Sequence, residues 1–367
     1  MSVFHRCIDW FEQRLNLSEI FSFWTTFGIL YAPLDANRPV REVVREALLR
    51  PLPSYQRWPH VFGILTFVTF LLEVITGWLL AFYFQPTTDA AYESTRLIIR
   101  DTAFGWYIHQ MHYWGGHLLA VLLLLRLVRF FWHRVYKFPH ELTWIFGVIL
   151  FLLAVQACFT GKLLPWDQNG YWGTIRGLEL FERIPLFGPA MEYFVGGFKL
   201  EASLILRFYL LHVIFLPLLM FSFFYLHFAS VRRVGLSAVP ALEEKSAPIY
   251  PRHLMNLLII LLTLLGGLLS LAILLPATFA AKADPFQTPP GISISWYLLP
   301  LYGLFELAPW WLASWGTFLA TWMIVLFPFI DPETEQTPQR RRTVVWLACL
   351  AGLVLLILSY YGYSRRG

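Results

Sequence analysis

Seven apolar runs, each long enough to cross a lipid bilayer, constrain this chain more than any other feature of its sequence. A helix needs about 20 mostly apolar residues to span the ~30 Å hydrocarbon layer. Hydrophobic residues make up 57% of the chain and charged residues only 14%, whereas soluble domains carry about 25% charged residues. The sequence therefore predicts an all-α integral membrane protein with seven transmembrane helices. The runs lie near residues 61–84, 113–132, 142–160, 203–229, 254–276, 312–330 and 343–363.

Basic residues follow the second, fourth and sixth runs, and these three loops fall on one side of the membrane. Loops rich in Lys and Arg stay in the cytoplasm. We therefore expect a cytoplasmic N-terminus and an outer C-terminus, in the inner membrane of a bacterium. The formal net charge of +5 then needs no nucleic-acid partner. The residues are Arg129, Arg134, Lys137, Arg232, Arg233, Lys245, Arg252, Arg340, Arg341 and Arg342.

Four of the runs each carry two residues about fourteen positions apart. At a rise of ~1.5 Å per residue, such residues are ~21 Å apart on roughly one helix face. Imidazole is an axial ligand of heme iron, and glycine lets a macrocycle edge lie against the helix backbone. Two histidine-bearing helices facing two glycine-bearing helices predict a four-helix bundle with two stacked heme sites. The pairs are Gly63 and Gly77, His112 and Arg126, Gly147 and Gly161, and His212 and His227.

At the outer level the pattern is complete. We expect His112 and His212 to ligate the iron of an outer heme b, with Gly77 and Gly161 flanking the macrocycle. A single buried histidine is often only a hydrogen-bonded core group. Two histidines at matching depth inside a membrane bundle favour ligation, because ionisable groups there are functional by default.

At the inner level one ligand position departs from the pattern. His227 lies beside Gly63 and Gly147, but the opposing position is Arg126. Arginine stays protonated and offers no lone pair to a metal. Three outcomes are open: a heme with a single axial histidine, a heme with another ligand, or no heme. We expect a second, inner heme b with altered ligation on His227, because the histidine and both glycines are retained.

The chain divides into four parts by composition. Residues 1–58 form an N-terminal segment with amphipathic surface helices, and residues 59–234 hold the four paired runs. Residues 235–252 are polar, carry three prolines and read as a linker. Residues 253–367 contain three more spans and a long, proline-rich outer loop, which is too long for a bare connection and so predicts a functional segment.

Several motifs of this chain resemble cytochrome b of the Rieske/cytochrome b complexes. The similarity is closest to the bf type, with the cytochrome and its companion subunit four joined in one polypeptide, and it covers nearly the whole chain. The most specific motif, LLPWDQNGYWG, resembles the loop that follows the third span at the family's quinol site. The motifs are HELTWIFG (140–147), LLPWDQNGYWG (163–173), RFYLLHVIFLPLL (207–219) and ADPFQTPPGISISWYLLPLYG (283–303).

The resemblance implies a function and a set of partners. Members of the family are dimeric membrane enzymes that oxidise quinol at an outer site. One electron goes to a Rieske-type iron–sulfur protein and a c-type cytochrome, and the other crosses the membrane through two b hemes to an inner quinone site. By this resemblance the chain is a quinol:cytochrome c-type oxidoreductase subunit in a homodimeric, multisubunit complex.

At the outer quinol site this chain departs from the family. The family commonly has Pro-Glu-Trp-Tyr, whose glutamate accepts a quinol proton, whereas this chain reads Ile294-Ser295-Trp296-Tyr297. Trp296 and Tyr297 keep the aromatic wall that holds a flat ring. Ser295 cannot serve as a base at neutral pH. Asp167, in PWDQ, is the candidate substitute base.

The resemblance implies roles, or departures from the family pattern, at five further residues. Arg207 at the outer side and Arg129 at the inner side match positions that neutralise heme propionates. His60 stands where many bf-type proteins tether an extra heme through cysteine, and is either a cofactor partner or an ordinary interfacial histidine. His109 replaces a family arginine. Glu73 lies inside the first span, where the family more often has glutamine, and must be protonated, paired or hydrated.

Two functional readings follow. The first is a cytochrome b that moves electrons between quinone sites and partner proteins through b hemes, with modified bifurcation. The second is a non-bifurcating heme-bearing anchor that connects one quinone site with partner cytochromes or iron–sulfur proteins. The changes at Arg126 and Ser295 each fall at one end of the electron path across the membrane and could be linked. A neighbouring Rieske protein would favour the first function over the second.

Overall fold

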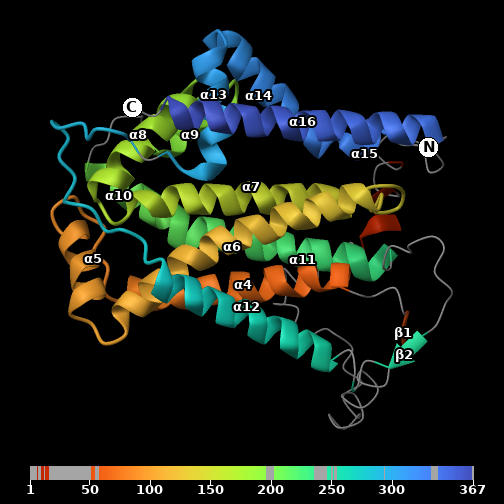
Figure 1. Cartoon of the computed structure of the whole chain (residues 1–367), viewed down its shortest axis with the longest axis horizontal. Coiled ribbons are helices and arrows are strands. Elements are labelled where there is room, and N and C mark those ends of the chain that lie inside the picture. The colour runs from red at the N-terminus through yellow and green to blue at the C-terminus, as the bar shows by residue number, and fades with distance from the viewer. Residues whose placement is uncertain are drawn as a thin grey trace.

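The computed structural model describes most of the chain and is helical nearly throughout the described part (Figure 1). Most of the predicted N-terminal segment 1–58 and of the linker 235–252 lies outside the described residues. The described residues are 6, 10–11, 13–15, 51–53, 58–195, 202–234, 246–248, 251, 254–292, 294–331 and 338–365.

The elements are named in chain order. Two short strands, β1 and β2, pair antiparallel. The other elements are helices: α4, α6, α7, α11, α12 and α16 are the long ones, and η1 is a π-helical turn. The bounds are β1 (Pro51–Pro53), α4 (Trp58–Ala81), α5 (Ala91–Arg100), α6 (Gly105–Trp132), α7 (Glu141–Leu163), α8 (Gln168–Glu182), α9 (Phe187–Val195), α10 (Ala202–Leu210), η1 (Leu211–Phe215), α11 (Leu216–Val234), β2 (Ser246–Pro248), α12 (Leu254–Leu274), η3 (Trp296–Leu298), α13 (Leu299–Leu307), α14 (Trp310–Val325), α15 (Phe327–Ile330) and α16 (Pro338–Ser364).

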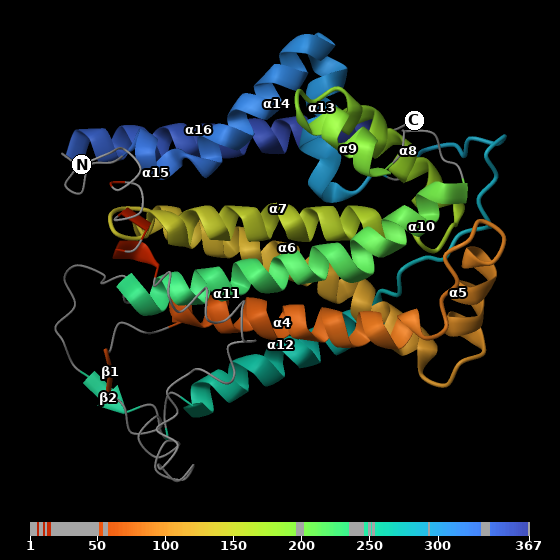
Figure 2. The same ribbon diagram turned by 180° about the vertical axis from the view of Figure 1, so that it is seen from behind.

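The predicted four-helix bundle is formed by α4, α6, α7 and the continuous helix α10–η1–α11, which run side by side (Figures 1 and 2). Its middle is filled by aliphatic and aromatic side chains, among them Leu123, Leu150 and Phe224, each at most 1% exposed. Since lipid gives no hydrophobic gain between spans, such close packing is what holds membrane helices together. Helix α12 packs beside α6, and α16 flanks the bundle on the other side.

Six helices in the described part of the chain are long and apolar enough to span a membrane. The seventh predicted span, near residues 312–330, forms α14, which has only 16 residues and is ~24 Å long at ~1.5 Å per residue. It ends at Val325, ahead of Phe327-Pro328, because proline cannot continue a helix. The predicted all-α membrane fold is thus confirmed, with one span shorter than expected.

Buried polar contacts tie the bundle to the C-terminal helices at one end of the molecule. Lys137 pairs with Asp331 across 2.7 Å, and Tyr136 donates its hydroxyl to the same carboxylate at 2.8 Å. The Arg341 guanidinium donates to the carbonyls of Phe131 and Trp132. Basic residues that follow the second span therefore lie at the same end as those that open α16.

Candidate heme and quinone site

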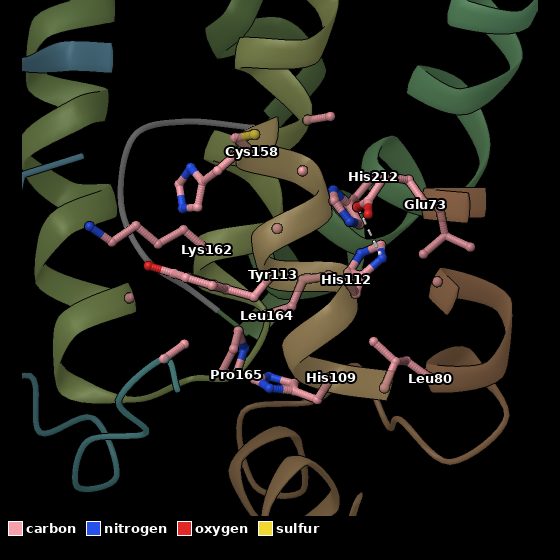
Figure 3. Close-up of a pocket in the computed structure, with 18 of the residues that line it drawn as sticks. Glu73, Leu80, His109, His112, Tyr113, Cys158, Lys162, Leu164, Pro165 and His212 are labelled. Atoms are coloured by element: carbon pink, nitrogen blue, oxygen red, sulfur yellow. Dashed lines mark ion pairs between the residues drawn. The ribbon is translucent and has the colours of Figure 1, made fainter. Parts of the chain in front are cut away.

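A cavity of about 440 Å³ lies at the opposite end of the bundle, between α4, α6, α7, η1 and the segment that ends in η3 (Figure 3). Its lining includes both predicted outer ligands, His112 and His212. The same cavity is lined by Ser295, Trp296 and Tyr297 of the predicted quinol-site motif. The structure thus brings the two predicted outer sites into one continuous space.

His112 and His212 face each other across this cavity (Figure 3). Their ring centroids are 6.0 Å apart, and the ring planes are inclined by 87°. Two imidazoles on opposite sides of one metal, each at a metal–nitrogen distance of ~2 Å, have centroids about 6 Å apart. The spacing therefore fits a single metal held between the two rings.

Two threonines set the tautomer of these imidazoles. Thr76 Oγ1 lies 3.0 Å from His112 Nδ1, and Thr160 Oγ1 lies 3.1 Å from His212 Nδ1. Each hydroxyl donates its one hydrogen to a carbonyl of its own helix, Leu72 at 2.7 Å for Thr76 and Gln156 at 3.0 Å for Thr160. Both hydroxyls therefore accept Nδ1–H, and each Nε2 lone pair is left for a metal.

The two outer glycines make room for the ligand rings themselves. A Cβ on Gly77 would lie 3.1 Å from His112 Cε1, and a Cβ on Gly161 would lie 2.7 Å from His212 Cε1. Each glycine directly follows one of the orienting threonines in the sequence. Glycine is expected at the macrocycle edge from the sequence, and in the structure it also leaves room for the imidazole that faces it.

Glu73 is a second neighbour of the outer ligand. Its Oε2 lies 3.2 Å from His112 Nδ1 (Figure 3). Its Oε1 is buried against Gly115 and has no hydrogen-bond partner among the described residues. Of the alternatives open for this acid, the structure shows a polar contact to the ligand histidine.

The inner level is arranged differently. Arg126 Nη2 contacts His227 Nε2, the nitrogen that would bind an iron. His227 is fully buried and stacks on Phe130, with ring centroids 6.2 Å apart. A Cβ on Gly147 would lie 3.3 Å from Leu127 Cδ2, so leucine occupies the space beside this glycine. In this arrangement the inner residues do not fit a heme ligated by His227.

The remaining predicted residues fall around these two levels. Arg207 is half-buried in the last turn of α10. Arg129 is half-buried, with its guanidinium 5.8 Å from the Phe130 ring centroid. His109 lines the outer cavity. His60 lies in α4, but its side chain is outside the described residues.

Asp167 has a structural place beside the cavity. Its Oδ1 accepts from the Gly170 amide at 2.7 Å and caps α8, and its Oδ2 accepts from the Ala280 amide at 2.9 Å. Burial raises the pKa of Asp167 above its ordinary value, against the lowering effect of these two backbone amides and of Lys162. Because both carboxylate oxygens accept hydrogen bonds from backbone amides, the geometry favours a capping role for Asp167 over the predicted role of substitute base.

Two cavity residues were not singled out from the sequence. Lys162 Nζ donates to Ser295 Oγ at 3.3 Å, and His117 Nδ1 lies 3.1 Å from Trp296 Nε1. His117 is an ionisable residue within an apolar run, and Lys162 is one directly after the end of the next run. That is the signal by which sequence reasoning could have found them.

Comparisons with known proteins agree with this architecture. A family model described as cytochrome b/b6/petB matches residues 49–235, and one described as cytochrome b (C-terminal)/b6/petD matches residues 282–366. Cytochrome b6 of Heliobacterium modesticaldum is 34% identical over 207 residues, which cover 56% of this chain and 97% of that protein. The menaquinol:cytochrome c reductase cytochrome b subunit of Geobacillus thermodenitrificans is 32% identical over 235 residues, covering 64% and 98%.

A solved structure is similar over nearly the whole chain. It is a chain of a hyperthermophilic respiratory complex III, with a TM-score of 0.73 and 24% sequence identity. The similarity covers 90% of this chain and 99% of that one. At this identity the match bears on the fold, and it covers a larger share of this chain than the two sequence relatives do.

Proposed function

This chain belongs to the cytochrome b family, and we propose that it passes electrons between a quinone in the outer cavity and partner redox proteins through one heme b on His112 and His212. It is the cytochrome b subunit of a quinol:cytochrome c reductase-type complex, and so part of an oxidoreductase. The observation that supports the proposal is that one cavity is lined both by His112 and His212 and by Ser295, Trp296 and Tyr297.

In this proposal, different residues of the outer level bind the heme iron, the heme propionate and the quinone ring. A heme bound here supplies one-electron chemistry. His112 and His212 present Nε2 lone pairs, and the threonines before Gly77 and Gly161 hold the rings in that orientation. Arg207, at the outer end of the same bundle, is the residue that would pair with a propionate. Trp296 and Tyr297 form the wall for a flat quinone ring.

The proposal leaves the inner level out of the electron path. Arg126 meets the iron-binding nitrogen of His227, and Leu127 fills the space beside Gly147. Together with Ser295 in place of the family's proton acceptor, this supports the non-bifurcating function over electron transfer across the membrane.

A second candidate is an inner heme with altered ligation and modified bifurcation. One observation favours it. Arg126 Nη1 and His227 Nδ1 are both buried and have no hydrogen-bond partner among the described residues. Buried polar atoms are rarely left unsatisfied, and an acceptor group bound beside Arg126, such as a propionate, would satisfy Arg126 Nη1.

Partners and orientation complete the proposal. A relative is named as the cytochrome b subunit of a menaquinol:cytochrome c reductase, which supports a cytochrome c as a partner in a multisubunit complex. The Rieske-type iron–sulfur protein and the homodimer are part of the proposal through the motifs that resemble the Rieske/cytochrome b complexes. Arg341 bonds to the carbonyl of Trp132 at the C-terminal end of α6, whereas the outer cavity is lined by the N-terminal half of the same helix, so the two lie at opposite ends of the bundle. By the positive-inside rule, the end with Arg341 is cytoplasmic, and the cavity faces the outside of a bacterial inner membrane.

The test uses the purified complex and a short-chain naphthoquinol. We expect the quinol to reduce a low-spin b absorbance in the wild type, and the His212→Ala variant to lack that absorbance. His133→Ala, which changes an exposed histidine beyond the end of α6, is the matched control and keeps the signal. An unchanged low-spin spectrum in His212→Ala, or a heme that neither naphthoquinol nor benzoquinol reduces, would contradict the proposal.

A further inference from the structure

His117 lies on α6, five residues after the ligand His112, and lines the outer cavity. Its ring is surrounded by aromatic rings, which restrict its orientation. The centroid distances are 4.8 Å to Tyr113, 6.4 Å to Trp296 and 6.4 Å to Tyr297. An imidazole held in this way presents its remaining polar atom in a fixed direction.

The hydrogen bond to Trp296 decides which nitrogen of His117 carries the proton. The indole Nε1–H is only a donor, so His117 Nδ1, 3.1 Å away, must be the acceptor. The proton of this imidazole is therefore on Nε2. This is the opposite of the tautomer that the threonines impose on His112 and His212. While the indole bond stands, His117 can donate through Nε2 but cannot take up a proton at Nδ1.

Around Ser295, too, the protein offers a hydrogen-bond donor to the cavity in place of an acceptor. Where the family motif places a carboxylate acceptor, this chain has a hydroxyl that accepts from Lys162 Nζ at 3.3 Å. The motif is therefore flanked by N–H groups from α6 and α7. The ring oxygens of an oxidised quinone are carbonyls, which only accept hydrogen bonds, so an oxidised quinone is the ligand form that this polarity complements.

We propose that His117 donates its Nε2–H to a ring carbonyl of an oxidised quinone that lies against Trp296 and Tyr297. The inference rests on the proposed function, since it names the form of quinone that the outer cavity holds and the group that orients it. It assigns to His117 the fixation of one ring oxygen, and to Trp296 the fixation of the His117 tautomer.

The probe is a short-chain 1,4-naphthoquinone, ¹³C-labelled at one ring carbonyl and bound to the purified, heme-containing complex. Infrared difference spectra report the carbonyl stretch, and a titration gives Kd. In the wild type we expect one labelled band at lower frequency than for the probe in detergent. His117→Phe keeps a flat ring but loses the donor, so the labelled band should return to the frequency of the probe in detergent. The Kd of the probe should rise about tenfold, the upper range for the loss of one hydrogen bond.

Three other variants complete the comparison. His117→Gln keeps an N–H near the position of Nε2 and should retain the shifted band, whereas His133→Phe makes the same change outside the cavity and should behave as wild type. Should His117→Phe lose its heme spectrum, Trp296→Phe takes its place. It frees Nδ1 while keeping an aromatic ring, and is expected to weaken the band shift and raise Kd several-fold.

The outcomes separate this inference from the function on which it rests. If the wild type binds the probe but His117→Phe, or Trp296→Phe in its place, shows the same band and the same Kd, the inference is overturned and the quinone site stands. If the wild type has a normal low-spin heme spectrum and binds no probe, the quinone site of the proposed function fails, and the inference fails with it.

Discussion

At the scale of the residue, the outer and inner levels differ in what faces each histidine. A threonine and a glycine orient each outer ligand, whereas Arg126 engages Nε2 of His227. The outer ligands and the departure at Arg126 were predictable from spacing and side-chain chemistry. The orienting threonines, the contact between Arg126 and His227, and the position of His117 were not, because each depends on helix rotation and on contacts between distant segments.

The space at Gly161 gives a sharp prediction. In Gly161→Ala the new Cβ would lie 2.7 Å from His212 Cε1, closer than real Cβ atoms approach, so the imidazole must shift from its ligating position. We expect the outer heme content of the purified variant to fall several-fold, measured by the reduced-minus-oxidised b absorbance per chain. Gly352→Ala, where nothing lies within 4 Å, is the control and should match the wild type.

The inner level can be restored by one substitution. Arg126→His removes the guanidinium that meets His227 and places an imidazole opposite it, with Gly63 close by. We expect the variant to gain a second low-spin heme, seen as an added bis-histidine signal in electron paramagnetic resonance. Adding His227→Ala to the variant should remove that signal again. A variant that gains no heme would show that packing by Leu127 and Phe130, rather than Arg126 alone, closes the level.

At the scale of the element, the helix α10–η1–α11 contains a π turn that its sequence does not predict. His212 and His227 are fifteen residues apart, whereas the other three pairs are fourteen apart. The π-helical turn η1, Leu211–Phe215, includes His212 and extends from it toward His227. A π turn accommodates one extra residue, so the two histidines remain on one face. The apolar runs predicted the helices. The short α14 depends on the proline that follows it, and the π turn η1 depends on packing, which the apolar runs do not report.

Deleting Ile214, which is 51% exposed, should therefore be tolerated. Removing the extra residue returns the helix to α geometry with the fourteen-residue spacing of the other pairs, so the outer heme should be retained in the b absorbance. The contrasting variant deletes Leu152, between Gly147 and Gly161 in α7, where no π turn absorbs the change. That deletion rotates the rest of the helix by about 100° and should abolish heme binding. Equal heme contents in the two variants would refute this account of η1.

At the scale of the whole molecule, the bundle and the C-terminal helices are joined by buried charge as well as by apolar packing. Lys137 and Asp331, respectively 7% and 3% exposed, form an ion pair across 2.7 Å. We expect Asp331→Asn to lower the free energy of unfolding in detergent by about 3 kcal/mol, because one partner of a buried pair loses its counter-charge.

The control for this change is Arg176→Gln. It breaks the exposed pair with Glu179, whose side chains are 44% and 46% exposed, and exposed pairs contribute about 0–1 kcal/mol. Thermal unfolding followed by circular dichroism measures both variants. Equal losses in the two would mean that the Lys137–Asp331 contact does not join the two parts of the molecule.

The central claim is that electrons in this subunit use one heme, at the outer level, beside the quinone cavity. The most direct measurement is the number of hemes b per chain in the purified wild-type complex, determined as the pyridine hemochrome against protein concentration and paired with electron paramagnetic resonance. The account predicts one heme per chain, with a single bis-histidine low-spin signal that disappears in His212→Ala. Two hemes per chain in the wild type, or a b-type signal that survives in His212→Ala and is lost in His227→Ala, would contradict it.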